Sequence, residues 1–242
     1  MPSDSLRPTL GRRVASEAIG TALLLAAVVG SGIMGERLAG GNVAIALLAN
    51  TLATGAALVA LILTFGPISG AHFNPAVSAA DASQGGLSIG ELLAYVAAQV
   101  TGALVGVAAA DAMFGEPIFA WSTHVRAGFP QVLSESVATF GLLAVIWGCA
   151  RRRSDAVPFA VGAYITAAYW FTASTSFANP AVTLARMTTN TFAGIRPQDA
   201  PPFLVAQVVG AAAATLLFRW LVPTLPTSAA DVVVPHGHRE TR

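Results

Sequence analysis

The sequence predicts an all-α membrane protein of six transmembrane helices and two re-entrant half-helices, arranged as two inverted repeats. Its 242 residues are 55% hydrophobic and only 10% charged, which leaves too little charge to cover the surface of a water-soluble domain of this length. The apolar residues fall in long uncharged runs, and the segment Asn-Pro-Ala-Val occurs twice. These observations decide the fold class, and each predicted element is justified in turn below.

The apolar runs are each roughly 18 to 25 residues long, which is the length that crosses a hydrocarbon layer about 30 Å thick as a helix. One such run would also suit a buried core helix, but six in one chain favour a polytopic membrane protein. The first run follows RPTLGRRVASE and lacks a small-residue cleavage site, so we interpret it as a retained helix. The predicted spans are 14–34, 43–65, 92–110, 132–150, 157–173 and 203–221.

The basic residues are 13 arginines, without any lysine, and they are unevenly distributed. Nine lie on the side of the membrane that holds both termini, which predicts cytoplasmic termini in the cell membrane. We interpret the run RRR at 151–153 as a topology anchor and not as a nucleic-acid site. The nine are Arg7, Arg12, Arg13, Arg151, Arg152, Arg153, Arg219, Arg239 and Arg242, and the other four are Arg37, Arg126, Arg186 and Arg196.

A polar tail, 223–242, follows the last span and ends in PHGHRETR. Its two histidines at i and i+2 are compatible with a weak metal site, but a disordered polar end is the preferred interpretation. The single cysteine, Cys149, excludes an intramolecular disulfide. We expect no cofactor, no bound metal and no nucleic-acid partner.

Three sequence features occur twice in the same order, which predicts an internal duplication. Since each copy holds three spans, the second copy enters the membrane from the opposite side, with a pseudo-two-fold axis in the membrane plane. The repeats cover about 14–112 and 132–222 of a single domain, 1–242. The features are E-x-x-x-T at Glu17 and Glu135, NPAV at Asn74 and Asn179, and AQV-x-GA around Gln99 and Gln207.

Each Asn-Pro-Ala segment marks the start of a helix too short to cross a bilayer. Asparagine caps the first free amides, proline suits the first helical position, and about ten residues later the chain breaks at SQGG or TTNTFAG. The inverted repeat brings the two starts together near the midplane, where two positive helix ends and two amides favour oxygen lone pairs and repel cations. The residues concerned are Asn74, Pro75, Ala76, Asn179, Pro180 and Ala181.

On these motifs the chain resembles the aquaporin and aquaglyceroporin (major intrinsic protein) family over nearly its whole length. The resemblance is carried by SGAHFNPAVS, FANPAVT, the paired E-x-x-x-T segments and the paired glutamines. It implies a right-handed bundle with one pore per subunit, usually a homotetramer, that acts as a channel and not as an enzyme. Gly102 and Gly106, at GxxxG spacing, fit close helix packing.

The resemblance also implies roles for buried polar residues. In the family, the glutamates that correspond to Glu17 and Glu135 hold the half-helix loops by accepting backbone hydrogen bonds, and we expect Gln99 and Gln207 to support the same loops. The alternative is a functional carboxylate, which is the default suspicion inside a membrane. His72 resembles the family's pore-lining histidine; its alternative is a hydrogen-bonded loop residue.

The narrowest ring of the pore departs from the family pattern. The resemblance places an arginine directly after the second Asn-Pro-Ala and often an aromatic residue on the second helix, whereas this chain has Val182 and Thr54. Ser176 occupies a third position. The fourth is Ala167 by a straight count, or Tyr169 if a two-residue gap is allowed.

A ring of Thr, Ser, Val and Ala lacks the usual charge and is wide enough for solutes larger than water. Arg186, one turn further along, either replaces part of that charge from the vestibule or is an ordinary helix-end arginine. With valine at position 182, the chain resembles bacterial family members that are found with arsenic-resistance genes. The predicted solutes are water, glycerol-type polyols, arsenite as As(OH)3 and methylated arsenicals.

Three alternatives remain at this point. One is an ordinary water and glycerol facilitator without a role for arsenic. Another is an ion-coupled secondary transporter, which shares inverted repeats and interrupted helices but normally carries an ionisable coupling residue at the midplane. The third, a membrane enzyme, would need a nucleophile or metal cluster, and His72, Asp81 and Cys149 do not form one.

Overall fold

The computed structural model describes residues 8–150 and 154–222, and all the regular elements in this part of the chain are helices. The tail 223–242 with its histidines, and Arg7, Arg151–Arg153, Arg239 and Arg242, lie outside the described residues. The elements are α1 Leu10–Leu38, α2 Val43–Ser69, α3 Pro75–Ser83, α4 Ile89–Phe114, α5 Phe129–Ala150, η1 Ser154–Ala156, α6 Val157–Phe171, α7 Pro180–Arg186, η2 Pro197–Asp199 and α8 Ala200–Leu221.

The predicted all-α fold class is confirmed, with two short helices among long apolar ones. Five helices, α1, α2, α4, α5 and α8, are long and apolar enough to cross a membrane. The predicted span 157–173 corresponds to α6, which has 15 residues and therefore rises only about 22 Å. It follows the 3₁₀ turn η1 and packs against α2 and α5.

Local chemistry explains where several helices begin. Asn42 caps α2 by accepting hydrogen bonds from the amides of residues 44 and 45, and α4 begins with a capping box of Ser88 and Glu91. The short helices α3 and α7 begin at a proline, with Asn74 and Asn179 as their caps. The two Asn-Pro segments therefore start helices, as their sequence indicates.

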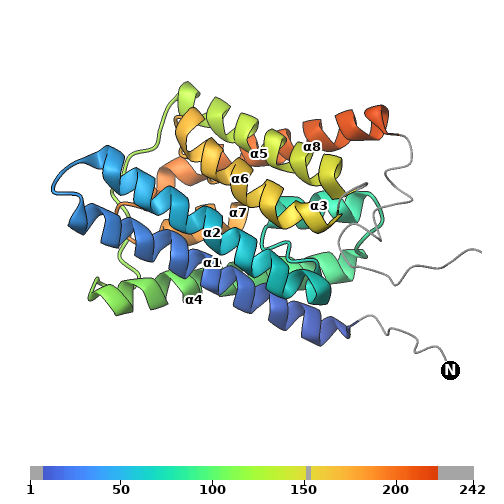
Figure 1. Cartoon of the computed structure of the whole chain (residues 1–242), viewed down its shortest axis with the longest axis horizontal. Coiled ribbons are helices and arrows are strands. Elements are labelled where there is room, and N and C mark those ends of the chain that lie inside the picture. Colours follow the sequence, from blue (N-terminus) through green and yellow to red (C-terminus); the bar gives the residue numbers. More distant parts are fainter. Residues whose placement is uncertain (1–7, 151–153, 223–242) are drawn as a thin grey trace, which may run out of the picture.

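The helices form two similar halves that interlock (Figure 1). In the first half α1 packs against α2 and α4, in the second α5 packs against α6 and α8, and α2 meets α6 across the boundary. The half-helices cross between the halves, since α7 contacts α4 and α3 contacts α8. Helix α1 begins, and α8 ends, at the same end of the bundle (Figure 1).

Glycines allow the closest helix approaches, and they do so at equivalent places in both halves. A Cβ at Gly102 or Gly106 of α4 would collide with a backbone carbonyl oxygen of α1, at Ala18 or Ala22. Likewise, a Cβ at Gly210 of α8 would collide with the carbonyl oxygen of Ser136 in α5. Small residues thus let the backbones touch, as is common between membrane helices.

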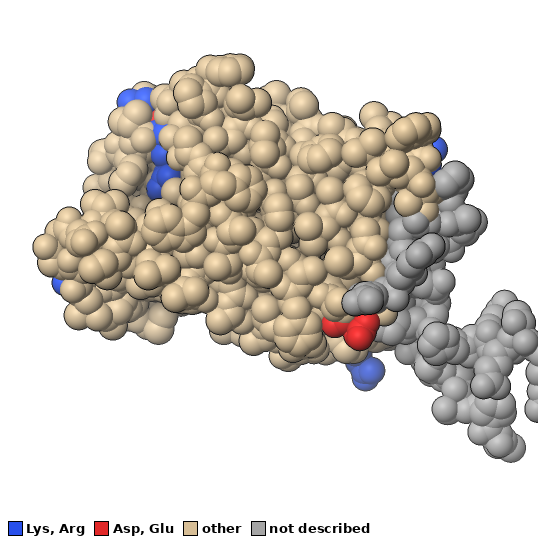
Figure 2. Space-filling view, turned by 45° about the horizontal axis from the view of Figure 1, so that its top comes forward, with Lys and Arg blue, Asp and Glu red and all other residues tan. Residues whose placement is uncertain are grey.

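The outer surface is apolar around the middle of the molecule. Figure 2 shows a broad region without charged residues, and the visible Arg, Asp and Glu atoms lie towards the two ends. Large apolar side chains such as Leu52, Val105, Phe159 and Val208 are exposed on this surface. In water, a patch of this extent would be unusual, whereas a lipid bilayer solvates it. The protein is a multi-pass membrane protein.

Candidate functional site: a pore between two asparagine loops

The two Asn-Pro-Ala segments meet, and they brace each other through hydrogen bonds. The Nδ2 atom of Asn74 donates to the carbonyl oxygen of Ala178 at 2.8 Å, and Nδ2 of Asn179 donates to the carbonyl oxygen of Phe73 at 2.8 Å. The Oδ1 atoms face the other way and cap α3 and α7. Because an amide nitrogen carries two hydrogens, each asparagine keeps a second N–H beyond its brace.

The loops before the two asparagines share an unusual backbone. Residues three and one before each asparagine have positive φ: 49° and 48° at Ala71 and Phe73, and 51° and 47° at Ser176 and Ala178. Such left-handed conformations are uncommon for residues other than glycine and cost free energy. They persist only where surrounding contacts hold them, and in both loops those contacts come from a buried glutamate.

Glu17 holds the first loop. Its side chain is fully buried, and Oε1 accepts hydrogen bonds from the amide of His72 at 2.9 Å and from Ser69 Oγ at 2.6 Å. Its Oε2 accepts from the amide of Phe73 at 2.7 Å and from Gln99 Nε2 at 2.8 Å. Both oxygens of this carboxylate are therefore occupied by neighbouring donors.

Glu135 holds the second loop in the same way. It is also fully buried, and it accepts the amide protons of Phe177 and Ala178, each at 2.9 Å. Gln207 Nε2 donates to it at 2.7 Å and to the hydroxyl of Thr183 at 2.8 Å. The structure thus brings each predicted glutamate and glutamine to the loop for which it was expected.

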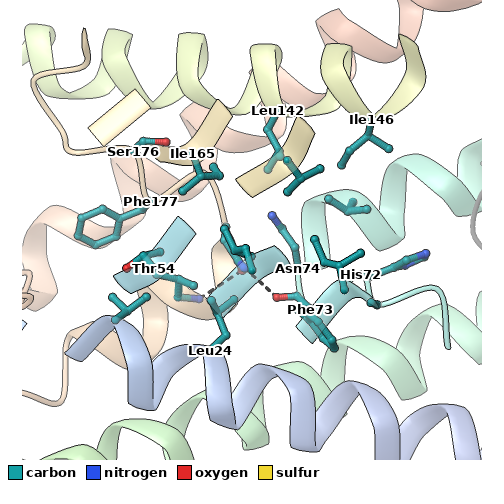
Figure 3. Close-up of a pocket in the computed structure, with 18 of the residues that line it drawn as sticks. Leu24, Thr54, His72, Phe73, Asn74, Leu142, Ile146, Ile165, Ser176 and Phe177 are labelled. Carbon is teal, nitrogen blue, oxygen red and sulfur yellow. Dashed lines mark hydrogen bonds between the residues drawn. The ribbon is translucent and has the colours of Figure 1, made fainter. Parts of the chain in front are cut away.

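A cavity of about 100 Å³ runs along both loops. Asn74, Asn179 and His72 line it together with aliphatic side chains from the surrounding helices. In Figure 3, Thr54, Ser176 and Phe177 lie on one side of Asn74 and His72 on the other. The cavity therefore offers a few polar groups along an apolar wall, which suits small uncharged molecules.

The residues predicted for the narrowest ring can be compared with those that line the cavity. Thr54, Ser176 and Val182 line the cavity, and so does Tyr169, whose hydroxyl oxygen lies 3.4 Å from Thr54 Oγ1. Ala167 is exposed on α6 and does not line this cavity, whereas the alternative Tyr169 does. Two residues along a helix turn the side chain by about 200°, so residues 167 and 169 face opposite ways.

His72 is held by contacts with neighbouring side chains. Its Nδ1 lies 2.9 Å from Ser78 Oγ, and its ring packs edge-on against Tyr95 with the centroids 5.4 Å apart. The Nε2 atom is buried without a hydrogen-bond partner among the described residues. The side chain is thus fixed by its loop and lines the cavity as well.

Three further residues meet at the opposite end of the pore. Arg186 is only 2% exposed and lines the cavity, and its guanidinium lies over the ring of Phe177. The guanidinium of Arg126 lies near the same ring. In the sequence, Arg126 is recognisable only as one of the charges that set the membrane orientation, and Phe177 has no predicted role. No motif connects a loop arginine with a residue some fifty positions away.

Known proteins match this chain over nearly its whole length. The family model described as Major intrinsic protein matches residues 5–176 and 152–240. The chain is 58% identical over 213 residues to the Aquaglyceroporin AqpS of Rhizobium meliloti, which covers 88% of this chain and 91% of that protein. It is 30% identical over 227 residues to the Aquaporin Z of Bradyrhizobium diazoefficiens, covering 87% and 93%.

A solved structure supports the fold. The X-ray structure of the aquaglyceroporin from Plasmodium falciparum superimposes with a TM-score of 0.72, covering 90% of this chain and all of that one at 21% identity. An identity this low supports the architecture alone. Membership of a family is supported by the family model and by the more similar relatives. The crossed asparagines, the two buried glutamates and these matches agree, and the chain belongs to the major intrinsic protein family, a family of membrane channels and not of enzymes.

Proposed function

We propose that this protein is a passive channel for small neutral solutes. The observation that carries the proposal is the cavity shared by the two crossed asparagine loops, which has apolar walls and a few polar groups. The 58% identical relative is named an aquaglyceroporin. Water and glycerol-type polyols are therefore the first expected solutes, and arsenite, as As(OH)3, and methylated arsenicals are the proposed larger ones.

The glutamates argue against an ion-coupled transporter. A coupling carboxylate must exchange a proton or an ion with the transport path. Glu17 and Glu135 have their oxygens filled by loop amides and glutamine side chains, and neither lines the cavity. We assign them, with Gln99 and Gln207, to loop support.

The proposed selectivity filter is the ring of Thr54, Tyr169, Ser176 and Val182. Three of its residues carry hydroxyl groups and the fourth, Val182, is aliphatic. A solute with several hydroxyl groups and a compact shape meets both kinds of side chain, as glycerol and As(OH)3 do. An ordinary water and glycerol facilitator is the second candidate, and it differs only in rejecting the arsenic solutes.

The proposal also includes the surroundings of the pore. The arginine distribution favours cytoplasmic termini in the cell membrane, and the exposed apolar side chains of the bundle face lipid and, in a homotetramer, neighbouring subunits. Crosslinking of the detergent-solubilised protein followed by mass measurement tests the oligomer. A monomeric mass under all conditions would reject it.

The test of function is the solute profile of purified protein in vesicles. We expect stopped-flow swelling to show passage of water, glycerol and arsenite, with rates linear in the gradient and insensitive to ion gradients. If glycerol, urea and arsenite are all excluded while water passes, the polyol proposal is rejected. If glycerol passes and arsenite does not, the ordinary facilitator is the correct alternative.

Val182→Arg sharpens this test. Val182 is 5% exposed and lines the cavity, so a guanidinium there narrows the free cross-section. We expect glycerol and arsenite fluxes to fall by about tenfold and water flux by much less, because small permeants tolerate a narrower pore. An unchanged profile places Val182 outside the constriction. Equal loss of all permeants, in protein that reaches the membrane, indicates simple blockage.

A further inference from the structure

Arg186 stands where the pore cavity meets a second cavity. The second cavity has a volume of about 400 Å³ and lies at one end of the bundle, beside the α1–α2 turn and the loop before α5. His124 and Arg126 are among the residues that line it. Among the described residues, Arg186 alone lines both cavities. Figure 2 shows basic side-chain atoms within a hollow at one end of the molecule. A solute that moves between the two cavities therefore passes Arg186.

The side chain of Arg186 is held with its charged group towards the path. Helical side chains tilt towards the helix N-terminus, so an arginine at the end of α7 reaches back towards the asparagine loop. Its Cζ atom lies 3.5 Å from the centre of the Phe177 ring, and its Nε donates to the carbonyl oxygen of Ala193. The two terminal nitrogens make no hydrogen bond within the described part of the chain, yet they are not sealed from solvent.

Arg126 holds the surrounding loops and adds a second charge. Its Nε donates to the carbonyl oxygen of Gly194 at 2.8 Å, and its terminal nitrogens donate to the carbonyl oxygens of Ser174 and Phe192. Its Cζ atom lies 5.0 Å from the centre of the Phe177 ring. Burial lowers the pKa of Arg126 to about 10, so this guanidinium keeps its proton at neutral pH.

Within the described residues, neither of these two guanidinium groups forms an ion pair with a carboxylate. Asp199, which accepts the backbone amide of Arg126, is paired with Arg196. Burial and the nearby arginines lower the pKa of His124, so this side chain adds no charge at neutral pH. Two carboxylates lie further off: Glu36 lines the second cavity, and the buried Glu135 acts on both arginines through space. Because neither carboxylate contacts a guanidinium group, the junction itself presents positive charge, and a charge acts more strongly away from bulk water.

We infer that Arg186 is a specificity-determining residue of this channel. Its guanidinium group excludes cations at the outer mouth and donates hydrogen bonds to the oxygens of neutral hydroxylated solutes. Arg126 is its positioning residue, acting through Phe177 and the loops. The inference rests on the proposed channel function. It places the charge of the filter one turn outside the ring of residues 54, 169, 176 and 182, on a side chain that reaches back towards that ring.

The test compares purified full-length variants in vesicles by two readouts, glycerol swelling and leakage of methylammonium and protons followed with an internal pH dye. Arg186→Met keeps the length of the side chain and removes its charge, Arg186→Lys keeps the charge, and Arg37→Met is the control. Arg37 lies at the same end, paired with Glu116 on the surface with 49% of its side chain exposed, and lines neither cavity.

We expect Arg186→Met to raise the cation leak by about tenfold or more. Its glycerol flux should stay within about threefold of the parent, since a neutral solute loses hydrogen-bond donors but meets no new charge. The lysine variant should keep the leak within about twofold, and the Arg37 control should match the parent. A cation leak in Arg186→Met equal to that of the parent, with glycerol flux retained, overturns the inference and leaves the channel proposal intact.

Two further outcomes are separated by the design. If the parent passes neither water nor glycerol above empty vesicles, the proposed function itself fails. If Arg186→Met does not fold, Arg186→Gln replaces it, because glutamine keeps a donor for the carbonyl of Ala193 without the charge. Loss of both neutral variants while the lysine variant folds with unchanged selectivity shows that the charge is structural, and this also overturns the inference.

Discussion

The two repeats of this protein are nearly identical in what supports the pore and different in what lines it. Glu17 and Glu135 each accept hydrogen bonds from the backbone amides of the two residues directly before the asparagine. Each also accepts one from a glutamine on the last helix of its repeat. Since both loops contain left-handed residues at the same offsets, the supporting framework has kept its two-fold character.

The pore-facing positions have diverged. Two residues before the asparagine, the first repeat has His72, which lies against Ser78, and the second has Phe177, on which two guanidinium groups gather. One mouth therefore presents an imidazole and the other a pair of positive charges. The comparison teaches that the duplicated parts build the channel, while the parts that are not duplicated give its two ends different chemistry.

The largest effect is expected from Glu17→Gln and Glu135→Gln, which test whether the two supports are equivalent. A glutamine turns an NH2 group towards loop amides that are themselves donors, and losing charge-assisted bonds to two backbone amides costs about 3 to 5 kcal/mol. We expect both variants to lose most folded protein in the membrane and to unfold at a lower temperature in detergent. Glu116→Gln, on the surface beside Arg37, is the control. Tolerance of only one replacement would break the equivalence.

Asn74→Asp and Asn179→Asp should have the next largest effect, because they separate the helix cap from the cross-brace. Aspartate still caps a helix, but its oxygen then faces the carbonyl oxygen of the opposite loop, where the amide now donates at 2.8 Å. We expect about tenfold lower glycerol flux in both variants, since an unmatched buried acceptor displaces the loop. Asn42→Asp, which caps α2 without a brace, should conduct normally. Parental flux in both pore variants would contradict a shared site.

Gly102→Ala and Gly210→Ala should have the smallest effect of the three, and they compare how tightly the halves pack. The added Cβ would collide with the carbonyl oxygen of Ala18 in the first half or of Ser136 in the second, so the helices must separate, at about 1 to 3 kcal/mol. Thermal unfolding in detergent should detect both losses. Gly90→Ala, in α4 but with no atom near its added Cβ, is the matched control. Unequal losses would show that one half adapts more easily.

Much of the architecture follows from sequence periodicity and repetition. Apolar runs long enough to cross a bilayer predict the helices, because lipid leaves the backbone of such a segment no other way to satisfy its hydrogen bonds. The duplicated Asn-Pro segments predict two half-helices that meet, because an odd number of spans inverts the second copy. Glu17, Glu135, Gln99 and Gln207 can be assigned to the loops by resemblance, because their places in the two copies correspond.

The details of the pore wall required the tertiary structure. Counting back from Asn179 selects Ala167, yet Tyr169 lines the cavity, because the irregular loop after α6 has no fixed residue period and an error of two residues reverses the face of a helix. The sequence also leaves Arg186 and Arg126 as unrelated charges. Only the folded chain brings both to Phe177, because a long side chain's direction and the closure of distant loops are set by packing and hydrogen bonding, which sequence spacing does not encode.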